Sequence, residues 1–161
     1  MNRNAVLLDT SFFLRLLNEH DPLFKNSEGY FRYFLENDYI LFISTISIAE
    51  YCVIGTIDQL PLRNPRVLPF NVDHAKRTGE FARILFSARR FGSVSFNERR
   101  IIPNDSKLFA QADVEAHIRY FVTSDTECMK AHAALTRHTH AQFDIIDISQ
   151  SYGDRFGVLP L

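Results

Sequence analysis

The chain has 161 residues, close to the usual length of one folded domain, and 46% of them are hydrophobic, including 15 phenylalanines. This is enough apolar side chain for a full core, so the composition excludes a disordered chain. The formal net charge of −1 excludes a globally basic nucleic-acid binder, although a local basic patch is compatible with it. We therefore expect one folded domain over residues 1–161.

The cysteines and the apolar runs indicate the cellular compartment in which the protein is expected to work. Cys52 and Cys128 form no CxxC pair, and we expect both to be small buried side chains in a reducing compartment. The apolar run before Asp9 has only four residues, too few for the apolar part of a signal peptide. No stretch approaches the roughly 20 apolar residues of a membrane span. These features predict a cytoplasmic protein with no membrane partner.

Short apolar runs recur along the chain and predict the strands of a sheet. The first is uninterrupted, as is typical of a strand covered on both faces in a parallel sheet. The predicted strands cover residues 5–8, 39–43, 66–70, 118–122 and 143–148. Residues 59–69 carry three prolines and are expected to be mostly loop, so the third strand is predicted to be short and at the edge.

Apolar residues at helical spacing predict helices between these strands. Helices are expected over residues 12–17, 27–37, 47–54, 73–89, 105–116 and 127–136. Asp21-Pro22 ends the first of them, and residues 89–103 are expected to be irregular. Strands that alternate with helices indicate βαβ units. The sequence thus predicts a three-layer α/β/α fold with a mostly parallel central sheet.

Acidic residues lie just past predicted strands or on the helices that follow them. They are Asp9, Glu50, Asp105 and Asp125. Because parallel sheets bind ligands at the carboxyl ends of their strands, we expect these side chains to meet at one edge. Gathered carboxylates repel one another unless a cation lies between them, and oxygen donors alone favour Mg²⁺ or Mn²⁺ over Zn²⁺. This pattern predicts a metal-dependent phosphodiesterase.

We expect Asp9 and Asp125 to contact the metal directly, with Asp105 completing the site or acting through water. Glu50 is expected to hold a second ion or to position the attacking water. Glu127 is either a fifth acid or a solvent-facing side chain. Neighbouring hydroxyl groups are expected to fix the carboxylates by hydrogen bonds, and these belong to Thr10, Ser11, Thr123 and Ser124.

Each acid also has a purely structural interpretation. Asp9 and Asp105 both stand where a helix N-cap is expected. Glu50 is harder to explain in this way, because it lies among apolar neighbours, where an unpaired carboxylate is costly. His138 and His140 have metal-like spacing for a strand, but they lie in a polar stretch that we expect to be a solvated loop.

The segment 89–103 is basic, with four arginines and Glu98 as its one acid. The arginines are Arg89, Arg90, Arg99 and Arg100. A flexible basic segment ahead of the third acid could guide RNA phosphates toward the metal. The alternative interpretation is a solvated loop with no ligand.

The segments that carry the four acids resemble those of PIN domains. Residues 7–11 (LLDTS) resemble the opening strand with the first acid, and residues 46–50 (ISIAE) resemble the helix with the second. Residues 105–112 (DSKLFAQA) resemble the helix with the third, and residues 121–125 (FVTSD) the strand end with the fourth. The four occur in the family's order, and the resemblance spans roughly residues 5–148.

This resemblance implies a Mg²⁺- or Mn²⁺-dependent endoribonuclease, most similar to the small toxin components of bacterial and archaeal toxin–antitoxin pairs. It further implies a homodimer and a cognate antitoxin protein. The candidate dimer faces are the predicted helical residues 12–17 and 30–35.

Two other functions stay open. A phosphoacceptor receiver domain also places acids at strand ends, but it needs an acid pair after the first strand and a lysine after the last. This chain has only Asp9 at the first place, and no lysine follows Lys130. A catalytically inactive PIN-like scaffold that binds RNA or protein is the second alternative, and the presence of all four acids weighs against it.

Overall fold

The computed structural model describes residues 4–90 and 98–159, with the backbone alone for residues 90 and 98–103. The described chain forms a five-stranded sheet in which every pairing is parallel. Its strands are β1 (Ala5–Leu8), β2 (Ile40–Ser44), β3 (Arg66–Leu68), β4 (Ile118–Thr123) and β5 (Asp144–Asp147). In the order β3-β2-β1-β4-β5, the chain winds outward from β1 to one edge and then returns to build the other.

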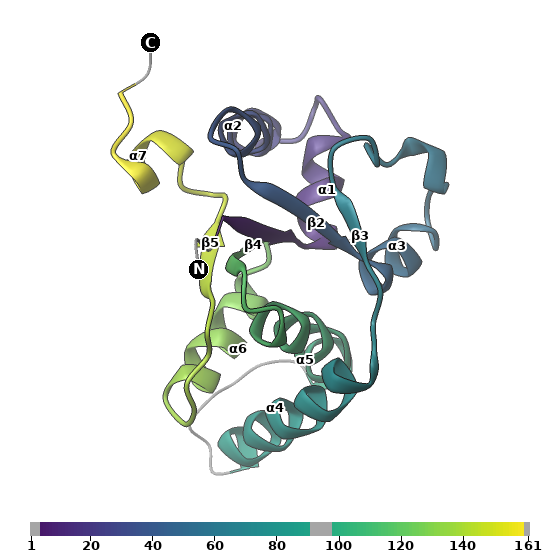
Figure 1. Ribbon diagram of the computed structural model, residues 1–161, viewed down its shortest axis with the longest axis vertical. Helices are drawn as coiled ribbons and strands as arrows, with labels where there is room; N and C mark the ends of the chain where they lie inside the picture. Colours follow the sequence, from purple (N-terminus) through teal and green to yellow (C-terminus); the bar gives the residue numbers. More distant parts are fainter. Residues whose placement is uncertain (1–3, 91–97, 160–161) are drawn as a thin grey trace.

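Helices cover both faces of this sheet, which gives the predicted three layers (Figure 1). One layer holds α4 (Val72–Arg90), α5 (Glu98–Val114) and α6 (Thr126–Thr136). The other holds α1 (Thr10–Leu16), α2 (Phe24–Glu36) and α7 (Tyr152–Phe156). The short helix α3 (Thr45–Tyr51) follows β2 and contacts both α1 and α5, and the 3-10 helix η1 (Ile57–Gln59) comes after it.

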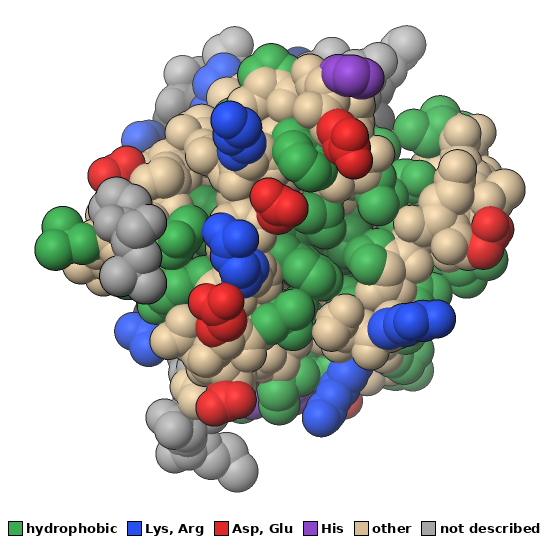
Figure 2. Space-filling view, turned by 90° about the horizontal axis from the view of Figure 1, so that it is seen from above, with side chains coloured by type: hydrophobic (Ala, Val, Ile, Leu, Met, Phe, Trp, Pro, Cys, Tyr) green, Lys and Arg blue, Asp and Glu red, His purple; other side chains and the backbone are tan. Residues whose placement is uncertain are grey.

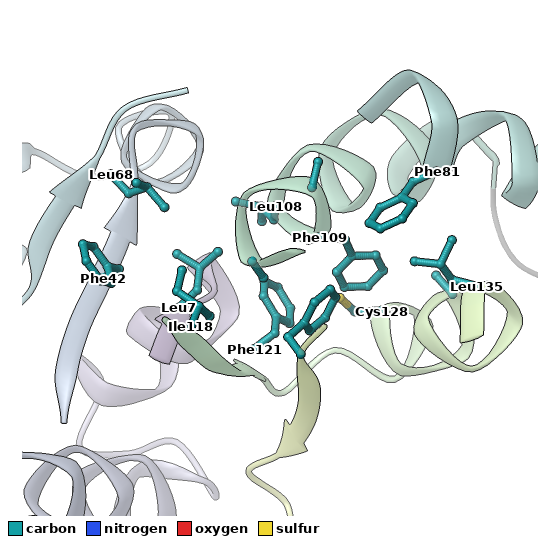
Figure 3. Close-up of a cluster of buried hydrophobic side chains, with 14 of the residues drawn as sticks. Leu7, Phe42, Leu68, Phe81, Leu108, Phe109, Ile118, Phe121, Cys128 and Leu135 are labelled. Atoms are coloured by element: carbon teal, nitrogen blue, oxygen red, sulfur yellow. The ribbon is translucent and has the colours of Figure 1, made fainter. Parts of the chain in front are cut away.

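The alternating side chains of β1 explain why the sheet is covered twice. Ala5 and Leu7 enter the core under α4, α5 and α6, whereas Val6 and Leu8 enter the core under α1 and α2. All four are fully buried. Figure 3 shows the first core, in which Leu7 and aromatic rings from the strands, α4 and α5 gather between the sheet and these helices.

The second core contains the inward-facing residues of the two helices that were expected to form a dimer face. Phe12 and Phe13 of α1 and Tyr30 and Phe34 of α2 are at most 1% exposed, and they pack against the sheet. These side chains therefore stabilise the fold and leave no apolar face of their own for a second copy.

Several sequence-based boundaries differ from the structure. The helix expected from residue 27 begins at Phe24, and the one expected from residue 105 begins at Glu98. Residues 89–103 were expected to be irregular, but their described part is helical at both ends. Cys128 is buried as predicted, whereas Cys52 is exposed at the end of α3. In the described part of the chain, no helix is long and apolar enough to span a membrane.

Candidate active site

Asp9 lies directly after β1, where the sheet reverses its winding between β1 and β4. Its backbone N–H donates to Val122 O at 3.0 Å, which joins it to the end of β4. The residue is 7% exposed, and its carboxylate accepts three hydrogen bonds. Oδ1 accepts from Thr10 N at 2.7 Å, and Oδ2 accepts from the hydroxyls of Ser11 and Thr123 at 2.8 Å each. Asp9 thus caps α1 and also faces the neighbouring strand end.

The end of β4 brings the fourth acid to the same place. The buried hydroxyl of Thr123 accepts from Asp125 N at 3.0 Å, and Ser124 N donates to Ser11 Oγ at 3.0 Å. Asp125 itself is exposed and caps α6, with Oδ1 accepting from Glu127 N at 2.9 Å. The hydroxyls of Ser11 and Thr123 therefore join the first and fourth acidic segments.

Glu50 projects from α3 and is half-buried. Its Oε2 accepts from Thr10 Oγ1 at 2.5 Å, and its Oε1 accepts from Asn104 Nδ2 at 2.6 Å. The Thr10 hydroxyl was expected to support an acid, and it reaches Glu50 while the backbone N–H of the same residue reaches Asp9. The second acid is therefore linked to the first through one residue.

Asp105 lies inside α5, seven residues after its first residue, so it is not the N-cap that its sequence context allows. Its Oδ2 is buried and has no hydrogen-bond partner among the described residues. Burial, and then the charges of Asp9, Asp125 and Glu50, raise the pKa of Asp105 to about 8. Because all three other acids act on this carboxyl, the four belong to one electrostatic site.

The pKa of Asp9 is also raised. Burial raises the pKa of Asp9 to about 6, with a contribution from the charge of Glu50, against the hydrogen bonds of Thr123 and Ser11. A pKa near neutral pH in a buried acid indicates a group that lacks a compensating positive charge.

The chemistry of these donors fits a hard divalent cation. Every side-chain atom of the four acids that could bind a metal is an oxygen. The buried Oδ2 of Asp105 has no hydrogen-bond partner among the described residues, and a bound cation would be a partner for it. Within the described ranges, no three acidic, histidine or cysteine side chains stand close enough to hold one ion as they are. Asp9 and Glu50 instead use both of their oxygens in hydrogen bonds.

Two other groups of candidate residues have their side chains directed elsewhere. The carboxylate of Glu127 pairs with Lys130 at 2.7 Å on the surface of α6, and the residue reaches the site through the backbone N–H that donates to Asp125 Oδ1. His138 and His140 are exposed in the turn region after α6, as expected for a solvated loop.

The four arginines are not in one loop, contrary to expectation. Two end α4 and two lie in the first turn of α5, in the order Arg89, Arg90, Arg99 and Arg100. Arg89 is half-buried and makes contacts within the protein. The side chains of the other three lie outside the described residues.

Sequence reasoning missed two residues beside the acids. Arg15 Nε donates to Ser124 Oγ at 3.3 Å, and its Nη1 pairs with Asp21 at 2.6 Å. It lies four residues after Ser11 on α1, a spacing that could have placed both on one helix face. The second is Asn104, and no pattern in the sequence indicates its contact with Glu50.

Neither protein-family models nor curated protein sequences match this chain. Solved structures do. FitAcB from Neisseria gonorrhoeae matches with a TM-score of 0.60 at 15% identity over 90% of this chain and 99% of the other. VapBC2 from Rickettsia felis, bound to a DNA fragment from its promoter, matches with a TM-score of 0.56 at 18% identity over 89% and 99%.

VapC20 from Mycobacterium tuberculosis, a toxin that cleaves the sarcin–ricin loop, matches with a TM-score of 0.53 at 17% identity over 78% of this chain and 94% of the other. The sheet order, the layers and these likenesses define an α/β protein with the PIN-domain fold. The resemblance to PIN-domain toxins of toxin–antitoxin pairs is confirmed for the fold.

Proposed function

We propose that this protein is a metal-dependent endoribonuclease that hydrolyses RNA phosphodiester bonds, and that it acts as the toxin of a toxin–antitoxin pair. The observation that carries the proposal is the buried, unpartnered Oδ2 of Asp105 beside three further acids at the switch point of the sheet. The toxin neighbours in fold support the choice of RNA as substrate. Such an activity belongs in the cytoplasm.

In this proposal Asp9, Asp105 and Asp125 hold the cation. Mg²⁺ or Mn²⁺, when bound, would supply the charge that lowers the pKa of an attacking water and neutralises the leaving oxygen. Glu50, fixed at both oxygens by hydrogen bonds, orients that water. The Ser11 and Thr123 hydroxyls keep the carboxylate of Asp9 in one rotamer.

A groove on the α1–α2 face is the proposed docking site for an antitoxin protein. It has a volume of about 440 Å³, and Figure 2 shows hydrophobic side chains gathered in a hollow on this face. Its apolar lining comes from Leu16, Leu17, Phe24, Phe31 and Pro61, with Glu19 and Glu28 also lining it. These acids favour a partner segment that is amphipathic and basic. Leu17→Glu should abolish co-purification with that partner, and unchanged co-purification would exclude the groove.

We also propose a homodimer. Its contact must use outward-facing residues, such as Leu14 and Leu35, which are each 38% exposed, because the inward faces of α1 and α2 fill the core. Light scattering at micromolar concentration should give twice the mass of the chain, and a monomer mass would contradict the proposal.

Asp9→Asn, Asp105→Asn and Asp125→Asn should each reduce Mn²⁺-dependent cleavage of a mixed RNA pool by more than about 100-fold. Each change removes a negative charge with little change of shape, so the far-ultraviolet circular dichroism should stay that of the wild type. Asp58→Asn, on the exposed η1, is the matched control and should cleave at the wild-type rate.

Wild-type cleavage rates in two of the three site variants would show that the site is assigned wrongly. RNA binding without any cleavage by the wild type would instead favour the inactive PIN-like scaffold.

A further inference from the structure

Glu50 is held by two neutral donors from two different helices. Thr10 Oγ1 donates from the start of α1 at 2.5 Å, and Asn104 Nδ2 donates from α5 at 2.6 Å. Thr10 directly follows Asp9, and Asn104 directly precedes Asp105. Each donor is therefore the chain neighbour of another acid, and Glu50 is the point at which three acidic segments are joined.

The position of Asn104 excludes the ordinary explanation for an asparagine in this sequence context. It lies six residues after Glu98, where α5 begins, so it is not the N-cap of that helix. Asn104 is also more than a surface residue of the helix, because it is half-buried and its amide donates to the carboxylate of Glu50 on α3.

The chemical type of the donor is informative. A lysine or arginine in this place would neutralise Glu50, whereas an amide N–H fixes the carboxylate and leaves its full negative charge available to a cation. An aspartate at residue 104 would have the same shape but would repel Glu50. Among the residues that could fill this position, an amide is therefore well suited to orient an acid without cancelling it.

We propose that Asn104 is a positioning residue of the acidic site, which holds Glu50 facing Asp9 and Asp105 and thereby sets the affinity for Mn²⁺ or Mg²⁺ and the rate of RNA cleavage. The inference rests on the proposed function. Asn104 has no charge, yet it should change the affinity of the site for a cation.

The test is a double-mutant cycle between Asn104 and Glu50, with two readouts. One is the Kd for Mn²⁺ obtained from the rise of Tm with Mn²⁺ concentration, and the other is the kcat of RNA cleavage at saturating Mn²⁺. Asn104→Ala should weaken Mn²⁺ binding or kcat by about 10–100-fold. In the Glu50→Gln background the same change should have less than about a twofold further effect, because the partner is already altered.

Asn104→Asp is the second variant, since it keeps the shape and loses the donor. It should be at least as impaired as Asn104→Ala, whereas a role in packing alone predicts near wild-type behaviour. Asn64→Ala, in an exposed loop, is the control and should match the wild type in both readouts.

Two results would overturn the inference alone: a wild-type Mn²⁺ response and cleavage rate in Asn104→Asp, or effects of Asn104→Ala and Glu50→Gln that simply add. A wild type that neither cleaves RNA nor is stabilised by Mn²⁺ would overturn the proposed function, and this inference with it.

Discussion

Burial and the neighbouring acids make ionisation of Asp105 unfavourable in the folded, metal-free protein. Its pKa is raised from 3.8 to about 8 by burial and by the other three acids, and burial raises that of Asp9 to about 6. Because these folded-state values exceed those of the unfolded chain, the folded state binds more protons between about pH 4 and pH 8. The free energy of unfolding of the metal-free protein should therefore fall as pH rises through that window.

Asp105→Asn should remove much of this dependence. In chelator, the Tm of the wild type should fall between pH 5 and pH 8.5, while that of the variant should change less and be higher at pH 8. The wild type should lose on the order of a few kcal/mol of unfolding free energy over this pH range, and each kcal/mol lowers its Tm by about 2–4 °C. Asp58→Asn, with an exposed carboxylate, should follow the wild type. If the Tm of wild type and of Asp105→Asn changed with pH in parallel, the surroundings of Asp105 would not raise its pKa.

The acids could be found from sequence because of where the strands end. Asp9 follows β1 directly and Asp125 follows β4 by two residues, so the apolar runs that predict the strands also place these carboxylates. Asn104 could not be found in the same way, because its contact with Glu50 joins residues 54 positions apart and depends on the packing of α3 against α5.

The start of α5 shows how packing overrides a local signal. Pro103 suggests that a helix begins after it, since a proline in a helix interior removes a backbone hydrogen bond and costs about 3 kcal/mol. The helix nevertheless begins at Glu98 and continues through Pro103. It packs along α4 and buries Leu108 and Phe109, and these contacts offset the local cost.

The terminal helix α7 was missed for a different reason. It has only five residues, too few for a periodic pattern, and it depends on long-range aromatic contacts. Phe156 stacks on Tyr33 of α2 with ring centroids 4.5 Å apart. Ser151 caps its start, and Gly157 ends it in the left-handed conformation with φ of 67°.

Two glycines should respond in opposite directions to substitution by alanine. Gly157→Ala should lower stability by about 1 kcal/mol, because its positive φ disfavours a side chain. Gly79→Ala, in the exposed middle of α4 with free space around it, should raise stability by about 0.5–1 kcal/mol. Urea unfolding of both variants measures the difference. A stabilising Gly157→Ala would contradict the left-handed end of α7.

The three-layer arrangement followed from the sequence because parallel strands covered on both faces are read as uninterrupted apolar runs. The order of the strands did not, since no pattern states that β1 pairs with both β2 and β4. The sequence likewise did not separate the inward-facing residues of α1 and α2 from those left outside for a dimer contact. An apolar helical stripe has the same sequence pattern whether it meets the sheet or a second copy, and here it meets the sheet.

The proposed function depends on acids from separate segments, Asp9, Asp105 and Asp125, holding one cation. Thermal unfolding of the wild type and of Asp105→Asn at pH 7.5, each with chelator and with Mn²⁺, tests this directly. At a Mn²⁺ concentration of 100 times Kd, the wild type should gain about 2.7 kcal/mol, while the variant should gain much less because a ligand is missing. An equal gain in both proteins, or none in the wild type, would contradict a shared cation site.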